Sequence, residues 1–119
     1  MIKKFTGMGV SDNSNVVWVS VFHLYFGFNR KTAYCGNFVK VSVRKLRPES
    51  WLRRKTKVKA IIIRVRKEQI KCDGSWIKFR HNSSILLKKR LNTHGHRLFG
   101  PITFNVRREK FANSFIGII

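Results

Sequence analysis

Apolar and polar residues alternate along much of this chain, and an alternation with a period of two is typical of β-strands with one buried face. In residues 38–44 the valines occupy every second position, and lysine, serine and arginine stand between them. This pattern predicts a strand with one buried face and one basic, solvent-facing face. Residues 16–24 (VVWVSVFHL) are β-branched and aromatic and follow the turn-forming residues 11–15, which predicts a second strand.

Residues 57–66 (KVKAIIIRVR) alternate at both ends but are continuously apolar from 60 to 63. A continuous apolar run favours a central strand that is buried on both faces, with basic residues pointing outward at its ends. Asp73-Gly74 is a preferred pair for a two-residue type I′ turn, and residues 76–80 (WIKFR) fit the return strand of that hairpin. A further short strand is predicted at 84–87.

Only residues 106–115 have the spacing of an amphipathic helix. About five short strands separated by turns favour a mainly β protein, a small five-stranded β-barrel with a short C-terminal helical segment, because a closed barrel leaves no exposed sheet edge. The length of 119 residues fits a single domain, 1–119. We assign to it a basic loop at 45–59 and a C-terminal helical tail at 105–119.

The net charge of the chain indicates which class of molecule it binds. The chain has 26 Lys and Arg against five Asp and Glu, a formal net charge of +21. Such a surface repels itself unless a polyanion neutralises it, and nucleic acid does so while releasing condensed counterions. A membrane partner is excluded, because no apolar run approaches the roughly 18 residues of a spanning helix and the cations do not lie on one helical face.

The residues that could perform catalysis are few. The five carboxylates are scattered singly, so no pair is available for acid–base chemistry and an enzyme is not expected. His94 and His96 place two imidazoles near each other, but nothing in the sequence completes a four-ligand zinc site, so we expect neither metal nor cofactor. Cys35 and Cys72 are widely spaced, which indicates a reducing compartment without a disulfide framework.

The remaining signal is the mixing of basic and aromatic residues. Two loops are dense in cations, 45–59 and 86–98, and arginine binds phosphate while an aromatic ring stacks on an unpaired base. Trp51 lies inside the first loop and is the stacking candidate, whereas hairpin alternation favours a core position for Trp76 and Phe79. The candidate RNA-binding residues are Arg44, Lys45, Arg47, Arg53, Arg54, Lys55, Arg64, Arg66, Lys78, Arg80, Lys88, Lys89, Arg90, Arg97, Arg107 and Arg108.

Several motifs in the same order resemble the universal large-subunit ribosomal protein fourteen family over nearly the whole chain. They are Asp12-Asn13-Ser14, the strand 57–64 (KVKAIIIR), Asp73-Gly74-Ser75, the apolar residues 85–87, the closing motif 95–101 (Gly-x-Arg-x-Phe-Gly-Pro) and Glu109-Lys110-Phe111.

The resemblance implies a five-stranded barrel that binds large-subunit rRNA near the subunit interface, supports an intersubunit bridge in translation and performs no catalysis. It further implies contacts with small-subunit rRNA and with the neighbouring large-subunit proteins three and nineteen. It also implies a docking face for a ribosome-silencing factor, formed in part by Gly95, His96 and Arg97.

Departures from the family pattern indicate the compartment. Asn15 stands where glycine is usual, and Asn37, Lys57 and Arg80 replace common acids. Together with an apolar tail and the frequent Phe, Ile, Lys and Asn of an AT-rich genome, they favour a divergent mitochondrial ribosome, with a bacterial cytoplasm or a plastid as the alternative.

Two functions of other classes compete with a ribosomal role. A free single-strand-binding module with a barrel fold would use the same cations and aromatics, and it would bind isolated single strands without a ribosome. An RNA-modifying enzyme would need a cofactor pocket or paired catalytic groups, and neither is legible in the sequence.

Overall fold

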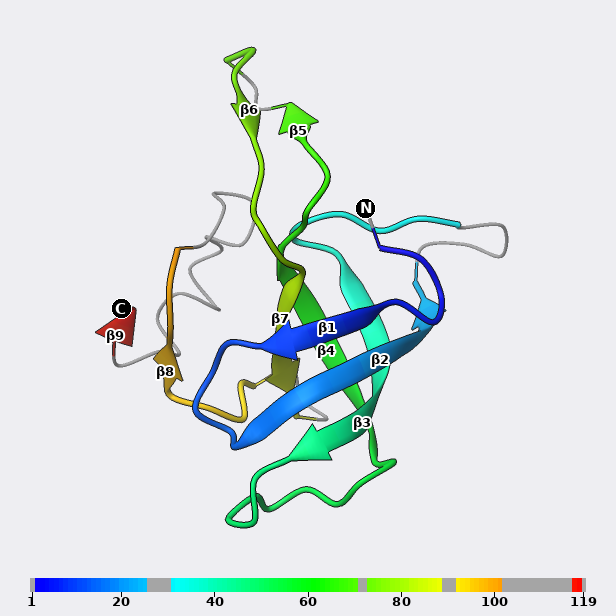
Figure 1. The fold of residues 1–119 in the computed structure, drawn as a ribbon, viewed down its shortest axis with the longest axis vertical. Helices are drawn as coiled ribbons and strands as arrows, with labels where there is room; N and C mark the ends of the chain where they lie inside the picture. The colour runs from blue at the N-terminus through cyan, green and yellow to red at the C-terminus, as the bar shows by residue number, and fades with distance from the viewer. Residues whose placement is uncertain (1, 26–30, 71–72, 89–91, 102–116, 119) are drawn as a thin grey trace.

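The chain forms a closed barrel of five strands in the order β1-β2-β3-β4-β7 (Figure 1). The computed structural model describes residues 2–25, 31–70, 73–88, 92–101 and 117–118, the last two by their backbone. The barrel strands are β1 (Gly7–Val10), β2 (Val16–Leu24), β3 (Phe38–Leu46), β4 (Lys57–Arg64) and β7 (Ser83–Leu87). Neighbours are antiparallel except β1 and β7, whose parallel pairing closes the barrel. The predicted five-stranded barrel is confirmed.

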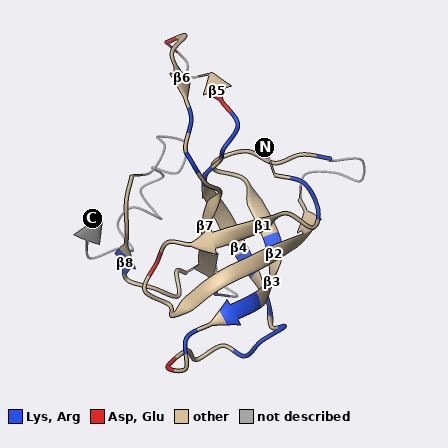
Figure 2. Ribbon diagram, in the orientation of Figure 1, with Lys and Arg blue, Asp and Glu red and all other residues tan. Residues whose placement is uncertain are grey.

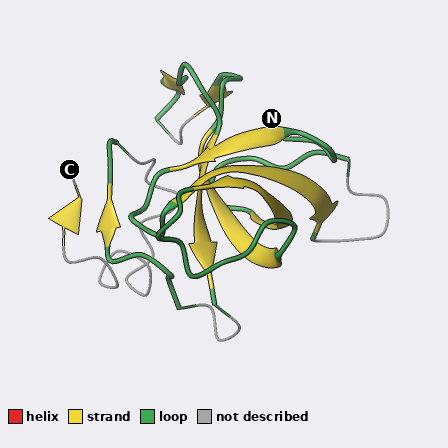
Figure 3. Cartoon of the chain, turned by 60° about the horizontal axis from the view of Figure 1, so that its bottom comes forward, coloured by secondary structure: helices red, strands yellow, loops and turns green. Residues whose placement is uncertain are grey.

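The described residues contain strands and loops but no helix (Figure 3). The helix expected at 106–115 lies outside the described residues. In the predicted helical tail, the two described residues form a short strand instead, β9 (Gly117–Ile118), parallel to β8 (Arg97–Leu98). Among the described residues, no helix has the length and apolar character needed to cross a membrane.

The barrel interior explains the alternation of β3. Val39, Val41 and Val43 are fully buried, while Arg44 is exposed on the outer face. A closed barrel turns every second side chain inward, so the predicted half-buried strand is confirmed. Strand β2 has the bounds that the sequence predicted.

Strand β4 is buried on both faces, as its apolar run predicted. Ala60 and Ile62 belong to the core inside the barrel. Ile61 and Ile63 belong to a second cluster outside it, together with Ile85, Leu87 and Leu98. The outer cluster ties the segment that contains β8 to the barrel wall, and each fully buried aliphatic side chain contributes about 1.5–3 kcal/mol to that attachment.

Arg64 corrects the sequence prediction, because its side chain is only 6% exposed. Its Nε donates to the carbonyl oxygen of Pro101 over 2.8 Å, its Nη2 donates to that of Phe99, and its Nη1 lies 3.2 Å from Nε2 of His81. Burial lowers the pKa of the guanidinium. The segment after β8 folds back over the end of β4 and encloses an arginine that the pattern placed in solvent.

The hairpin of β5 (Gln69–Ile70) and β6 (Trp76–Ile77) projects from one end of the barrel (Figure 1). A type I′ turn requires a positive φ at both central residues, and of Asp73 and Gly74 only Gly74 has one, 88°, so the predicted turn type is wrong. The Asp73 carboxylate accepts hydrogen bonds from the Ser75 amide at 3.0 Å and hydroxyl at 2.6 Å, which stabilises the turn that is formed instead.

Trp76 is 60% exposed, so its predicted core position is also wrong. Apolar and basic residues do alternate in the hairpin, but the hairpin projects from the barrel (Figure 1), and its paired residues Ile70 and Trp76 both remain exposed. Phe79, at the base of the hairpin, is half-buried.

We predict that Gly100→Ala destabilises the fold more than Gly74→Ala does. Both glycines have a positive φ, 82° and 88°, where alanine costs about 1–2 kcal/mol. A Cβ at Gly100 would in addition lie 3.0 Å from Cζ of Arg64 and closer still to Nη2, whereas one at Gly74 would meet nothing within 4 Å. Crowding a packed site adds about 1–3 kcal/mol.

Urea denaturation of the two variants and the wild type checks this prediction through their free energies of unfolding. Equal losses for both variants would show that Arg64 is not held against Gly100.

Candidate nucleic-acid-binding surface

The loop between β3 and β4 is ordered by its own hydrogen bonds. The amide of Arg47 donates to the carbonyl oxygen of Asn15 over 2.8 Å, and the amide of Ser50 donates to the carbonyl oxygen of Arg47 over 3.0 Å. The Ser50 hydroxyl then accepts from the amide of Leu52 at 3.2 Å, and the Leu52 side chain packs against the barrel core. The loop therefore has a fixed shape.

A second tight turn follows. The amide of Thr56 donates to the carbonyl oxygen of Arg53 over 3.2 Å, and Lys55 has a φ of 67°, a value that a type II turn requires at its third residue. The amide of Lys55 donates to the carbonyl oxygen of Val43 over 2.7 Å, which joins the turn to β3. The side chains of Arg53, Arg54 and Lys55 are all exposed on this turn.

Trp51 is 97% exposed between the ordered residues Ser50 and Leu52. Indole is mostly apolar and is usually buried in a monomeric protein. An exposed ring on a fixed loop among arginines has the geometry of a stacking platform for bases.

The Asp12-Asn13-Ser14 turn joins two distant parts of the chain. The Asp12 carboxylate accepts from the Ser14 amide at 3.2 Å and hydroxyl at 2.5 Å, and from the Leu86 amide at 3.3 Å. Asn13 Oδ1 accepts from the amides of His96 at 2.8 Å and Arg97 at 3.2 Å.

Gly95 is required for this junction, because an added Cβ would lie 2.6 Å from Asn13 Oδ1. Two sequence motifs separated by most of the chain therefore form one structural unit. The unit holds His96 and Arg97 exposed at the surface while Gly95 itself is buried.

Burial governs the ionisation of two groups at this turn. It raises the pKa of Asp12, although hydrogen bonds from Ser14 and Leu86 and the nearby His94 oppose the shift. Burial also lowers the pKa of His94, assisted by the charge of Lys88 and opposed by that of Asp12. At neutral pH His94 is therefore held in its neutral form.

The two basic loops meet across a groove made of two adjoining hollows of about 480 and 520 Å³. The hollows share Leu52, Lys88 and His94, so they lie side by side along these residues. We call this feature the loop groove, and its lining residues are Asn13, Ser14, Asn15, Tyr25, Lys40, Trp51, Leu52, Lys57, Val58, Lys59, Leu87, Lys88, His94 and His96.

The lysines of the loop groove lie opposite one another on neighbouring strands. Lys40 of β3 pairs directly with Lys59 of β4, and like charges in such a pair repel. The ammonium of Lys59 lies 4.8 Å from the ring centre of Tyr25 and 5.1 Å from that of Phe38, which offsets part of the repulsion. A phosphate between Lys40 and Lys59 would offset the remaining repulsion.

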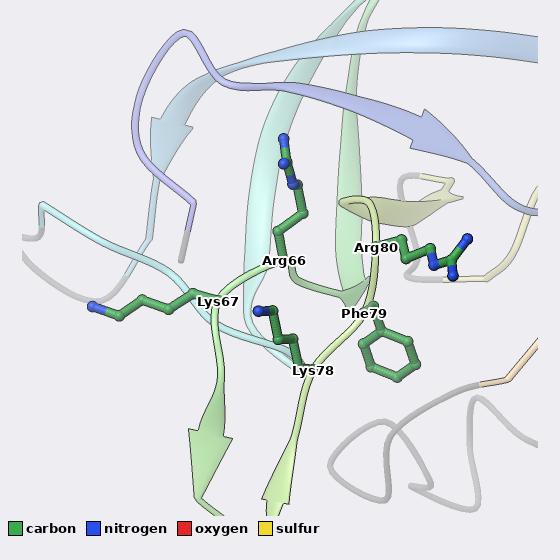
Figure 4. A pocket seen from close by; sticks show the side chains of 5 residues that line it. All are labelled: Arg66, Lys67, Lys78, Phe79 and Arg80. Carbon is green, nitrogen blue, oxygen red and sulfur yellow. The ribbon is translucent and has the colours of Figure 1, made fainter.

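A separate basic site surrounds the base of the β5–β6 hairpin. Arg66, Lys67, Lys78 and Arg80 carry four cations around the half-buried ring of Phe79 and an open hollow of about 780 Å³. Figure 4 shows the four side chains pointing in different directions around this hollow. Their spread suits contacts to several phosphates of a backbone better than a single small anion.

The structure distributes the predicted binding residues over two ends and one side of the barrel (Figure 2). Residues of the β3–β4 end, the hairpin base and the side are exposed, and Arg64 is buried. Four candidates, Lys89, Arg90, Arg107 and Arg108, lie outside the described residues. The exposed candidates are Arg44, Lys45, Arg47, Arg53, Arg54 and Lys55 at the loop, Arg66, Lys78 and Arg80 at the hairpin, and Lys88 and Arg97 on the side.

Sequence reasoning missed the residues that join the two loops into one groove, namely Lys40, Lys57, Lys59, Tyr25 and the Asn13–Asn15 turn. The cations between the valines of 38–44 were a signal for Lys40, but its partner on β4 depends on strand register. Among the described residues, no group of three His, Cys, Asp or Glu side chains could hold a metal ion.

Comparison with known proteins finds a matching family model and a relative that matches over its whole length. The family model described as ribosomal protein L14p/L23e matches residues 1–116. A protein of Tetrahymena pyriformis named large ribosomal subunit protein uL14m is 49% identical over 119 residues, which cover 100% of both chains.

We predict that His94 makes the fold less stable in mild acid. Burial lowers the pKa of His94 in the folded protein below its ordinary value of 6.5, which the unfolded chain keeps. Between the folded-state pKa and 6.5, the unfolded chain therefore binds more protons than the folded protein does. The contribution of neutral His94 to the free energy of unfolding is therefore complete above pH 6.5, and it is lost as the pH falls through the folded-state pKa. Urea denaturation from neutral pH downward should show a smaller loss for His94→Asn than for the wild type, and parallel curves would contradict the assignment.

Proposed function

Because the chain belongs to the ribosomal protein L14p/L23e family, and is therefore a structural ribosomal constituent and not an enzyme, we propose that it is built into the large ribosomal subunit. There it binds rRNA near the subunit interface and supports an intersubunit bridge in translation. The observation that carries RNA binding is the ordered β3–β4 loop, where exposed arginines and lysines surround the exposed Trp51. Such cations position a protein on phosphates without reading sequence.

The loop supports this proposal because its shape is fixed before binding. Hydrogen bonds of Ser50, Lys55 and Thr56 and the packing of Leu52 order the backbone. The backbone therefore loses little conformational freedom when its cations contact phosphates, and preorganisation of this kind increases affinity.

We extend the proposal to the protein and RNA neighbours. The exposed side chains of His96 and Arg97 stand on a backbone fixed by Asn13, and this supports a docking face at Gly95, His96 and Arg97 for a ribosome-silencing factor. The hairpin end, with its exposed Trp76, suits contacts with large-subunit proteins three and nineteen, and small-subunit rRNA lies across the interface.

The proposed compartment is the mitochondrion. Its support is the relative from Tetrahymena pyriformis, whose name carries the suffix m and which matches this chain from end to end, together with the AT-rich compositional signature.

Sedimentation of a tagged copy tests location and assembly together. In lysates of purified mitochondria, the protein should comigrate with the large subunit in a sucrose gradient and should remain with it after low magnesium dissociates the ribosome. Tagged protein at the top of the gradient, together with binding to isolated single strands, would favour the free single-strand-binding module.

Reversing the charge of Arg53, Arg54 and Lys55 together to glutamate should abolish incorporation into the large subunit. Each lost phosphate contact weakens binding, and each new carboxylate repels the backbone. The measurement is the fraction of tagged protein that sediments with the subunit. A matched control reverses the exposed Lys3, Lys4 and Lys31, which changes net charge equally, and should assemble better. Normal assembly of the first variant would refute the loop contact.

A further inference from the structure

We propose that the hollow between Trp51 and His96 in the loop groove binds one unpaired nucleotide of rRNA, with the base stacked on the Trp51 indole and a phosphate against Lys88. This inference rests on the proposed ribosomal function and names a particular ligand for one part of the surface.

The hollow is built by parts of the chain that are far apart in sequence. Trp51 and Leu52 come from the β3–β4 loop, Lys88, His94 and His96 come from the other basic loop, and the Asn13–Asn15 turn lies between them. Its volume of about 480 Å³ falls within the range of about 300–1,000 Å³ that is usual for small-molecule sites. A single nucleotide is a ligand of that class of size.

The backbone that carries the indole is held in place although the ring itself is exposed. Leu52, the next residue, packs on the barrel core, and its amide donates to the Ser50 hydroxyl. The ring therefore stands at the mouth of the hollow with 97% of its surface open to a ligand. Stacking on such a ring needs no particular base, because every base has a π-face.

The polar groups of the hollow are arranged to donate hydrogen bonds. Asn13 Oδ1 is occupied by the amides of His96 and Arg97, which fixes the amide plane and leaves the Asn13 nitrogen as a donor at the wall. Lys88 adds an ammonium, and its side chain is exposed. These donors match the carbonyl oxygens of a base edge and the oxygens of a phosphate.

The second hollow of the loop groove provides the path for the flanking backbone. Lys40 and Lys59, directly paired across β3 and β4, and Lys57 line it beside the ring of Tyr25. A strand of RNA that places a base on Trp51 therefore meets a row of lysines as it leaves the hollow, which is the combination that single-strand binding uses. The carboxylates of an acidic peptide could neutralise the lysines, but they supply no flat ring for the indole, whereas every nucleotide carries both a phosphate and a flat base.

The test uses large subunits purified from cells that carry the tagged chain. The subunits are crosslinked with ultraviolet light, and the crosslinked sites are mapped by mass spectrometry. We expect a peptide containing Trp51 to be joined to one rRNA nucleotide. In subunits with Trp51→Ala, the same base should become more reactive to base-modifying reagents by about fivefold or more, since stacking on an aromatic side chain is worth at least that factor.

Two variants separate a stacking role from a structural one. Trp51→Phe keeps a flat ring and should restore most of the protection, whereas Trp76→Ala removes the exposed indole of the hairpin and should leave this base protected. The reactivity of the base is read only in subunits that contain the variant, so the comparison does not depend on how efficiently Trp51→Ala is incorporated.

The outcomes also distinguish the two proposals. If the wild-type chain is absent from large subunits, both the ribosomal function and the nucleotide site are refuted. If it is present but Trp51 crosslinks only to protein, or every base keeps its reactivity in Trp51→Ala, the nucleotide site alone is refuted.

Discussion

The Asp12-Asn13-Ser14 turn, built around the buried carboxylate of Asp12, holds three parts of the chain at one side of the barrel. The carboxylate accepts hydrogen bonds from Ser14 in its own turn and from Leu86 in β7, and the adjacent Asn13 binds the backbone of His96 and Arg97. A carboxylate buried in this way is costly unless its oxygens are bonded, so the turn, the strand and the second basic loop are ordered together. The same turn, with Asn13 and Ser14, forms part of the wall of the loop groove.

The excess of positive charge explains why such local order matters. With a net charge of +21, the surface repels itself and loops rich in cations tend to spread apart. The fold resists this through apolar anchors and backbone hydrogen bonds, as at Leu52 and Lys55, and through rings beside Lys59. These contacts hold cations in positions that a polyanion can occupy, and bound polyanion then removes the repulsion.

The local pattern of apolar and polar residues was enough to predict the barrel, because inward-facing residues such as Val41 alternate with outward-facing ones along a barrel strand. It also predicted the two-faced burial of β4 and the exposure of Trp51. The local pattern gave the wrong burial for Arg64 and Trp76. The pattern shows which residues share a face of a strand, but it does not show which of these faces is covered by another segment of the chain. The loop groove depends on the pairing of Lys40 with Lys59 and on contacts between distant loops, and neither is encoded within one segment.

The hairpin and the β3–β4 loop lie at opposite ends of the longest axis of the molecule, which extends 43 Å (Figure 1). Exposed cations lie on the β3–β4 loop and at the base of the hairpin, with the closed barrel between them. For two RNA segments that bind at these two sites, the barrel acts as a spacer. Once one segment is bound, the effective concentration of the second segment at its own site is high only if the two segments are separated by the matching distance. Two contacts that are individually weak and sequence-independent can thereby measure a distance in a folded RNA.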